Sequence, residues 1–96
     1  MKNAYRELIK AAFQQGFTCS VWDGGEWQVK RSRSLSACVA AVRSVDEAEL
    51  RFRDKSGDVV GWALVSDAVD LEPEEKVIDH TCTRWTDDAL AYTTEC

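Results

Sequence analysis

The sequence lacks the features of a membrane or secreted protein. No apolar run approaches the roughly 20 residues that cross a bilayer. The first residues, Met1-Lys2-Asn3, lead into a polar amphipathic segment rather than a signal peptide. The cysteines, at positions 19, 38, 82 and 96, form no CxxC pair. These absences predict a cytoplasmic protein that contacts no membrane and keeps its thiols reduced.

Motifs for chemistry are equally scarce. The only histidine, His80, forms an i, i+2 pair with Cys82, which is a weak match to the ligand spacings of structural zinc sites. Nucleotide-binding GxxxxGK[ST] or GxGxxG and nucleophile GxSxG or SxxK motifs are missing. Gly24-Gly25 lies between two strand-like segments and not at a helix start, where free N–H groups bind phosphate. The sequence therefore predicts no catalytic residue, no metal and no cofactor, and it argues against an enzyme.

What is present predicts one small globular domain of uneven charge. The 96 residues form a single domain, and 45% of them are apolar. Residues 1–55 carry ten Lys/Arg against seven Asp/Glu, whereas residues 56–96 carry two against ten. This polarity predicts one basic and one acidic surface if the two halves do not interleave. Ordinary solvated faces are the simpler interpretation.

Two segments have the periodicity of amphipathic helices. In residues 3–15 and 35–43, apolar side chains recur at spacings of three and four. Asn3 and Ser34 stand at the N-cap positions, and Gly16 stands where a left-handed residue ends a helix. Both segments are therefore predicted to be helices packed by one face.

Five further segments read as strands. They are residues 17–22, 26–31, 48–54, 59–66 and 76–83. The fourth is apolar almost throughout, which is typical of a central strand covered on both faces. Thr86 is a candidate cap for a short acidic C-terminal helix. The order α-β-β-α-β-β-β, with a possible final helix, predicts a single α+β domain whose helices pack on an antiparallel sheet of about five strands.

The first hairpin, WDGGEW, admits two registers. A loop of the two glycines pairs Trp22 with Trp27, whereas a three-residue loop that includes Asp23 pairs Val21 with Trp27. A slip of one residue moves every side chain to the other face of the sheet. The three-residue loop puts Val21, Trp27 and Val29 on one apolar face, so it is favoured. It predicts that Trp27 lies in the core and that Trp22 points outward.

Basic residues near the outward tryptophan suggest one binding surface. The candidates are Trp22, Lys30, Arg31, Arg33, Arg51 and Arg53. Cations beside an exposed aromatic ring are typical of platforms for single-stranded nucleic acid. The negative net charge and the lack of a nucleic-acid-binding motif count against this function. Cross-strand pairing with Glu26, Glu49 or Asp54 is the simpler interpretation.

The acidic second half suggests another surface. Asp70, Glu72, Glu74 and Glu75 lie in a predicted exposed loop, residues 67–75. Such a cluster is suited to docking on a basic protein surface. A solvated acidic loop is again the simpler interpretation.

Three segments carry a family resemblance. DGGEWQVKRS, SVDEAELRFRDKSGDVVGWALV and VIDHT resemble, in order and spacing, a group of small uncharacterised proteins encoded by tailed phages and prophages. The similarity spans residues 17–81, and His80 replaces an aromatic residue of that family. The resemblance implies a phage or prophage accessory protein in the cytosol of a bacterial host. It implies no activity.

Together these observations predict a non-enzymatic protein-binding module that contacts a host or phage protein. Binding of single-stranded nucleic acid through the basic surface is the alternative. Both a monomer and a homodimer are compatible with the sequence.

Overall fold

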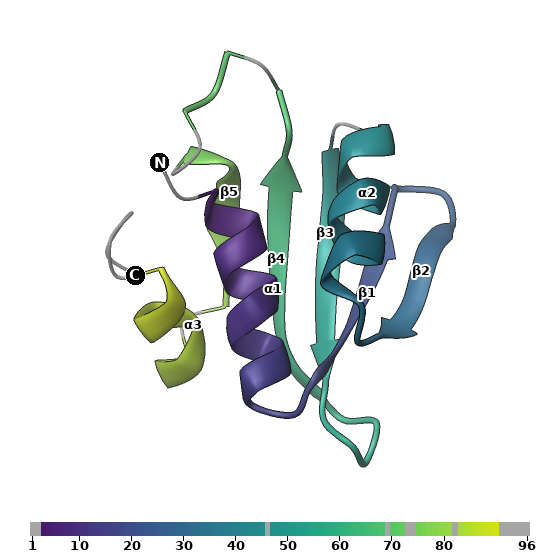
Figure 1. The fold of residues 1–96 in the computed structure, drawn as a ribbon, viewed down its shortest axis with the longest axis vertical. Helices are drawn as coiled ribbons and strands as arrows, with labels where there is room; N and C mark the ends of the chain where they lie inside the picture. Colours follow the sequence, from purple (N-terminus) through teal and green to yellow (C-terminus); the bar gives the residue numbers. More distant parts are fainter. Residues whose placement is uncertain (1–2, 46, 69, 73–74, 82, 91–96) are drawn as a thin grey trace.

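The computed structural model describes residues 3–90 apart from 46, 69, 73–74 and 82. Three α-helices and five β-strands follow one another in the predicted order, which confirms the α+β class (Figure 1). The elements are α1 (Ala4–Gln14), β1 (Thr18–Trp22), β2 (Trp27–Ser32), α2 (Leu35–Val45), β3 (Glu47–Arg53), β4 (Val59–Ser66), β5 (Val77–His80) and α3 (Arg84–Ala89).

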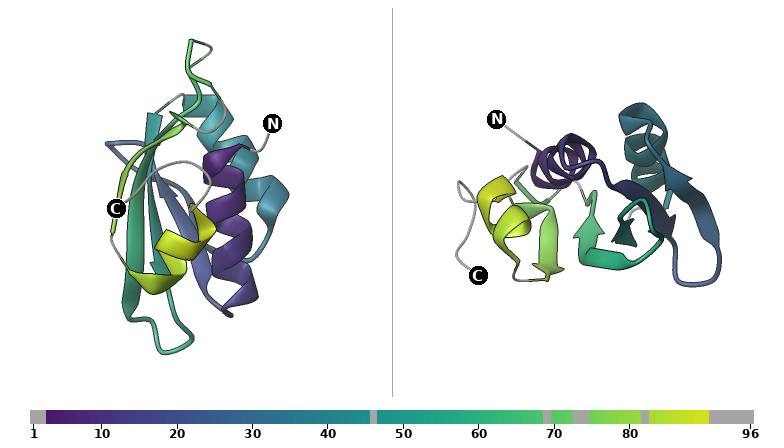
Figure 2. Two further views of the ribbon diagram at one scale, coloured as in Figure 1. Left: turned by 90° about the vertical axis from the view of Figure 1, so that its left-hand side faces the viewer. Right: turned by 90° about the horizontal axis from the view of Figure 1, so that it is seen from below.

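The strands form one antiparallel sheet with the order β2-β1-β3-β4-β5. Helices α1 and α2 lie side by side on one face, and α3 lies beside α1 near β5 (Figures 1 and 2). We call this the inner face and the opposite one the outer face. In the described part of the chain, no helix covers the outer face. The two sequence halves interleave in this sheet because β3 pairs with β4.

Burial alternates along the central strands because alternate side chains point to opposite faces. In β4, Ala63 and Val65 are buried against the helices, whereas Trp62 and Leu64 are only half-buried on the outer face. The prediction that this strand is covered on both faces is therefore wrong. Its continuous apolar run reflects an apolar outer surface and not a second covering layer.

The helix ends show which capping signals were interpreted correctly. The Asn3 side chain accepts hydrogen bonds from the N–H groups of Tyr5 and Arg6, which confirms it as the cap of α1. The cap of α3 is Thr83 and not the predicted Thr86. Thr86 is fully buried, and its hydroxyl accepts from the Thr83 N–H at 3.0 Å. It therefore occupies the third helical position of a capping box, so α3 begins earlier than predicted.

Trp85 of α3 packs on the inner face, where it leaves no space for a side chain at Gly61. Its indole N–H donates to the Val60 carbonyl at 3.1 Å. Its ring makes edge contacts with Phe17 and Phe52, at centroid distances of 5.4 and 5.1 Å. A Cβ at Gly61 would lie 2.8 Å from Trp85 Cζ2. The absence of a side chain at Gly61 is therefore what lets Trp85 pack against β4.

The hairpin between β1 and β2 does not have the predicted three-residue loop. Trp22 pairs with Trp27, and the Asp23 N–H donates to the Glu26 carbonyl at 3.1 Å. The Asp23 carboxylate also accepts from the N–H groups of Gly25 and Glu26, at 2.8 and 2.7 Å. These bonds to the ionised carboxylate lower the pKa of Asp23. The Asp23 side chain therefore holds the hairpin loop together through its hydrogen bonds to the backbone.

Two β-bulges explain why the predicted register is wrong. Val21 pairs with Val29, so the ladder shifts between this pair and the tryptophans. The shift lets Val29 pack against the core while Trp27 lies on the outer face beside Trp22. A second shift precedes the pair of Cys19 with Ser32. The prediction assumed a regular ladder, in which Trp27 and Val29 must share one face.

Candidate protein-binding surface

The outer face carries a surface that we call the tryptophan face. It consists of Trp22, Trp27, Glu49, Arg51, Trp62 and Leu64, contributed by β1 to β4. Strand pairing places Glu49 between Trp22 and Leu64, and it places Arg51 next to Trp62. Alternate residues of neighbouring strands thus form one continuous, half-buried row.

An arginine and two indoles form the centre of this face. The rings of Trp22 and Trp27 meet edge to face, with centroids 5.0 Å apart and an interplanar angle of 62°. The Arg51 guanidinium lies 5.5 Å from the centre of the Trp27 ring and donates to Glu49 at 2.7 Å. These four side chains line a shallow hollow of about 370 Å³. The ion pair leaves the centre of the face close to neutral.

Ser20 explains how Arg51 reaches Trp27 across an intervening strand. Arg51 pairs with Ser20 of β1, and Trp27 lies on β2, one strand further on. The short serine side chain leaves space for the arginine above it. Its hydroxyl accepts a hydrogen bond from the Arg31 N–H at 2.8 Å, at a residue with a φ of 47°. Ser20 therefore has two roles. It binds the backbone of β2 at Arg31 and leaves space for the Arg51 side chain.

A second hollow adjoins the first one on the other side of Trp22. Its volume is about 190 Å³, and Trp22 lines both hollows. Carboxylates from Asp23, Glu47 and Glu49 surround it, and Leu64 adds an apolar side. This end of the tryptophan face is therefore acidic.

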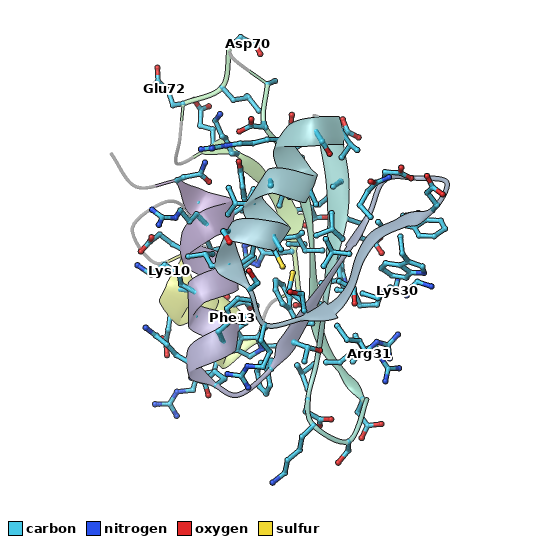
Figure 3. All side chains as sticks on the ribbon, turned by 45° about the vertical axis from the view of Figure 1, so that its right-hand side comes forward. Lys10, Phe13, Lys30, Arg31, Asp70 and Glu72 are labelled. Carbon is cyan, nitrogen blue, oxygen red and sulfur yellow. The ribbon has the colours of Figure 1, made fainter. Side chains whose placement is uncertain are left out.

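Three basic residues lie toward the opposite end of the face. Arg53 donates to the Gly57 carbonyl at 2.8 Å in the turn between β3 and β4. The Arg31 guanidinium reaches the same turn, 3.8 Å from the position of a Cβ at Gly57. Lys30 and Arg31 are exposed and extend from β2 (Figure 3). The same turn also contains Asp54 and Asp58, so this end of the face carries charges of both signs.

Arg33 does not belong to this surface, contrary to the prediction. Its guanidinium donates to the Phe13 carbonyl at 3.1 Å, near the C-terminal end of α1. A helix C-terminus attracts cations because its last carbonyls lack intrahelical partners. The residue follows the last residue of β2, where the chain turns toward the helical layer. Five of the six predicted residues therefore remain on the sheet side. An outer arginine, Arg51, does pair with Glu49, but both residues belong to β3, so the predicted pairing across strands is wrong for this pair.

The predicted acidic surface lies at a distance from the tryptophan face. Asp70 and Glu72 extend from the tip of the loop that follows β4 (Figure 3), and Glu75 is also exposed. Glu74 lies outside the described residues. The Glu75 carboxylate accepts a hydrogen bond from the Glu72 N–H at 3.3 Å, so two of the acids contact each other within the loop.

The base of the same loop is held by a polar cluster. Asp67 accepts from the Tyr5 hydroxyl at 2.9 Å and from the Lys76 ammonium at 3.0 Å. Burial acts to raise the pKa of Asp67, but the bonds from Lys76 and Tyr5 outweigh it and lower the pKa. This cluster has a structural role, because it fastens the loop to α1.

The thiols and the histidine form no chemical site in the described residues. Cys19 and Cys38 are buried free thiols, and their contact together with burial raises the pKa of Cys19. No group of three potential metal ligands exists within the described ranges, and Cys82 lies outside them. Among the described helices, none is both long and apolar enough to cross a bilayer.

The sequence prediction missed two tryptophans of the face. Trp27 was placed in the core because the bulges were not foreseen, and Trp62 was not considered as a surface residue. The apolar run of β4 was the available signal for Trp62. Its outward side chains form an apolar surface wherever no second layer covers the strand.

Comparisons of the chain with protein-family models, curated proteins and solved structures find no match.

Proposed function

We propose that this protein is a non-enzymatic protein-binding module, and that the tryptophan face is its contact surface. The carrying observation is a sheet face with three half-buried tryptophans and a central arginine that no described helix covers. Tryptophan and arginine are the residue types most enriched among the hot spots of protein interfaces. The phage resemblance makes a host or phage protein the expected partner and the bacterial cytosol the expected compartment.

The charges favour a protein partner over single-stranded nucleic acid. Arg51 already pairs with Glu49, and the hollow beside Trp22 is lined by carboxylates that repel phosphates. The guanidinium already lies over the Trp27 ring, which reduces the area available for stacking a base. A protein with an apolar patch and charges of both signs matches this face better than a uniformly negative strand does.

The shape of the face also supports binding rather than catalysis. Both hollows are shallow and open to solvent, so they suit contact with a partner surface. A catalytic cleft instead encloses its substrate and excludes water. The linings of the two hollows share Trp22 and Glu49, and the Trp22 ring is the expected anchor of the interface.

A capture experiment with matched variants tests the proposal. The tagged protein should retain a specific protein from bacterial host lysate, and Trp22→Ser should weaken this complex by roughly 30-fold, as for a hot-spot residue worth about 2 kcal/mol. Ile78→Ser is the control, because Ile78 is equally apolar and 52% exposed but lies outside both hollows. Equal retention by the two variants would contradict the proposal.

A parallel titration separates the nucleic-acid alternative. Tryptophan fluorescence is followed while single-stranded DNA or RNA is added at low salt. We expect no saturable change. Saturable binding that is lost in the Arg31→Ala, Arg53→Ala double variant would assign the face to nucleic acid instead.

A further inference from the structure

Helix α2 presents an unusual surface to solvent. Its exposed positions are mostly small and uncharged, and Arg43 is the only charged residue in the helix. The exposed positions of the neighbouring α1 instead include Arg6, Lys10 and Gln14. Surface helices normally carry charged and polar residues on the side that faces water. The composition of α2 therefore resembles that of a helix with a further packing partner.

A groove lies where α2 faces α1, on the side of the molecule opposite to the tryptophan face. Its volume is about 760 Å³. Leu35, Val39 and Ala40 supply apolar lining, while Arg6 of α1 and Arg43 of α2 supply two cations. No carboxylate belongs to its lining. The groove is thus apolar along its length and positive at its borders.

We propose that this groove binds an acidic amphipathic helix of a partner protein. The apolar side of such a helix would cover Leu35, Val39 and Ala40, and its carboxylates would meet Arg6 and Arg43. Charge complementarity selects acidic over basic helices, since both charged lining residues are arginines. Asp67 lies near Arg43, but its carboxylate already accepts from Tyr5 and Lys76.

The backbone chemistry of the groove favours a helix over an extended peptide. The groove is lined by side chains of two helices, whose N–H and C=O groups bond within each helix. An extended peptide would find no backbone partners there, whereas a helix satisfies its own.

The spacing along α2 also suits a helix. Ser36, Ala40 and Ser44 line the groove at intervals of four residues and span about 12 Å. Small side chains allow the 8–10 Å axial separation of packed helices.

Two synthetic peptides of about 15 residues, long enough to form a helix, test the proposal. Both carry the same leucines on one face, and one has glutamates beside them where the other has lysines. Binding to the 96-residue chain is measured by fluorescence anisotropy and mapped by amide chemical shifts. The glutamate peptide should bind saturably, perturb residues of the groove and weaken with added salt, whereas the lysine peptide should bind at least about tenfold more weakly.

Protein variants then locate the site. Arg6→Glu and Arg43→Gln should each weaken the glutamate peptide by about fivefold, the effect of one exposed ion pair. Ala40→Gln should weaken it at least about tenfold by filling the groove without changing charge. Arg84→Glu is the matched control, because it makes the same charge change on α3, outside the groove. Glutamate is compatible with the first turn of α1, so Arg6→Glu should retain the fold.

Three results would overturn the proposal. They are the absence of saturable binding up to about 1 mM, equal binding of the two peptides, and binding that Arg6→Glu and Ala40→Gln leave unchanged. Trp22→Ser should have no effect on this peptide. The outcome is therefore independent of whether the tryptophan face binds a protein.

Discussion

The two faces of the sheet use the same side chain in different ways. On the inner face, Trp85 donates to a backbone carbonyl, contacts two phenylalanine rings and lies directly on Gly61. On the outer face, Trp22 contacts another tryptophan and lines two open hollows. Both rings are half-buried, but Trp85 belongs to the helical layer and packs against the sheet, whereas no described helix covers Trp22. The same side chain thus joins two layers on one face and is left without a covering layer on the other.

Removal of one tryptophan from each face gives the largest expected contrast. Trp85→Ala should lower the free energy of unfolding by about 3 kcal/mol, because it empties the space between α3 and β4. Trp22→Ala should lower it by less than about 1.5 kcal/mol, because the Trp22 ring rests on one neighbouring indole on the uncovered face, whereas Trp85 contacts two phenylalanine rings and donates a hydrogen bond. Urea denaturation followed by far-ultraviolet circular dichroism measures both. Equal losses would remove the distinction between the faces.

Insertion of one methyl group beneath Trp85 tests the same packing from the sheet side. Gly61→Ala should cost about 1–3 kcal/mol, because the new Cβ would lie 2.8 Å from the indole ring. Gly25→Ala is the control, since its Cβ would meet only Asp23 Oδ1 at 3.7 Å. In a Trp85→Ala background, the cost of Gly61→Ala should fall to the part caused by Thr81 Oγ1, which would lie 3.2 Å from the same Cβ. Additive losses in the double variant would show that the ring is not what excludes a side chain.

The polar cluster that fastens a loop to the inner layer should make stability depend on pH. The pKa of Asp67 is lowered in the folded protein, so its contribution is present above the unfolded pKa of about 3.9 and is lost as pH falls through the folded value. Asp67→Asn should therefore reduce stability at pH 7 by up to about 1 kcal/mol and have a smaller effect at pH 3. Thermal unfolding across this range measures the difference. A loss independent of pH would assign the effect to geometry rather than to charge.

The smallest effect is expected for the central arginine of the outer face. Arg51→Ala removes a half-exposed ion pair and a cation–π contact, so stability should change by less than about 1 kcal/mol. The Trp27 ring should nevertheless become more accessible, which acrylamide quenching of tryptophan fluorescence detects. A large loss of stability would show that the outer face, like the inner one, is part of the structural core.

The parts of the fold that were predicted correctly depend on local signals. The cap at Asn3, the left-handed Gly16 and the bounds of β4 follow from a few neighbouring residues. The register of the first hairpin depends on how two strands pair, and a bulge there leaves little trace in the sequence. The same limit explains Trp27, which the bulge moved to the outer face. Arg33 was misplaced because its orientation depends on where the end of α1 lies in space.

The candidate surface was predicted only in part, because some of its contacts also depend on how separate strands pair. Trp22, Arg51 and Arg53 were recognised because they alternate with core residues on regular strands. The contact between Arg51 and Trp27 crosses β1 and depends on Ser20, which no periodicity identifies. The groove beside α2 was missed because its residues were read only as a helix that packs by one face.

The two bulges in β2 have a further consequence, which concerns self-association. Strands β2 and β5 form the two edges of the sheet, and unpaired edges invite the addition of strands from other molecules. The shifted ladder of β2 and the left-handed backbone of Arg31 interrupt the regular row of N–H and C=O groups that such a strand requires. The other edge, β5, has only four residues. An irregular edge and a short edge together disfavour edge-to-edge pairing of this open sheet.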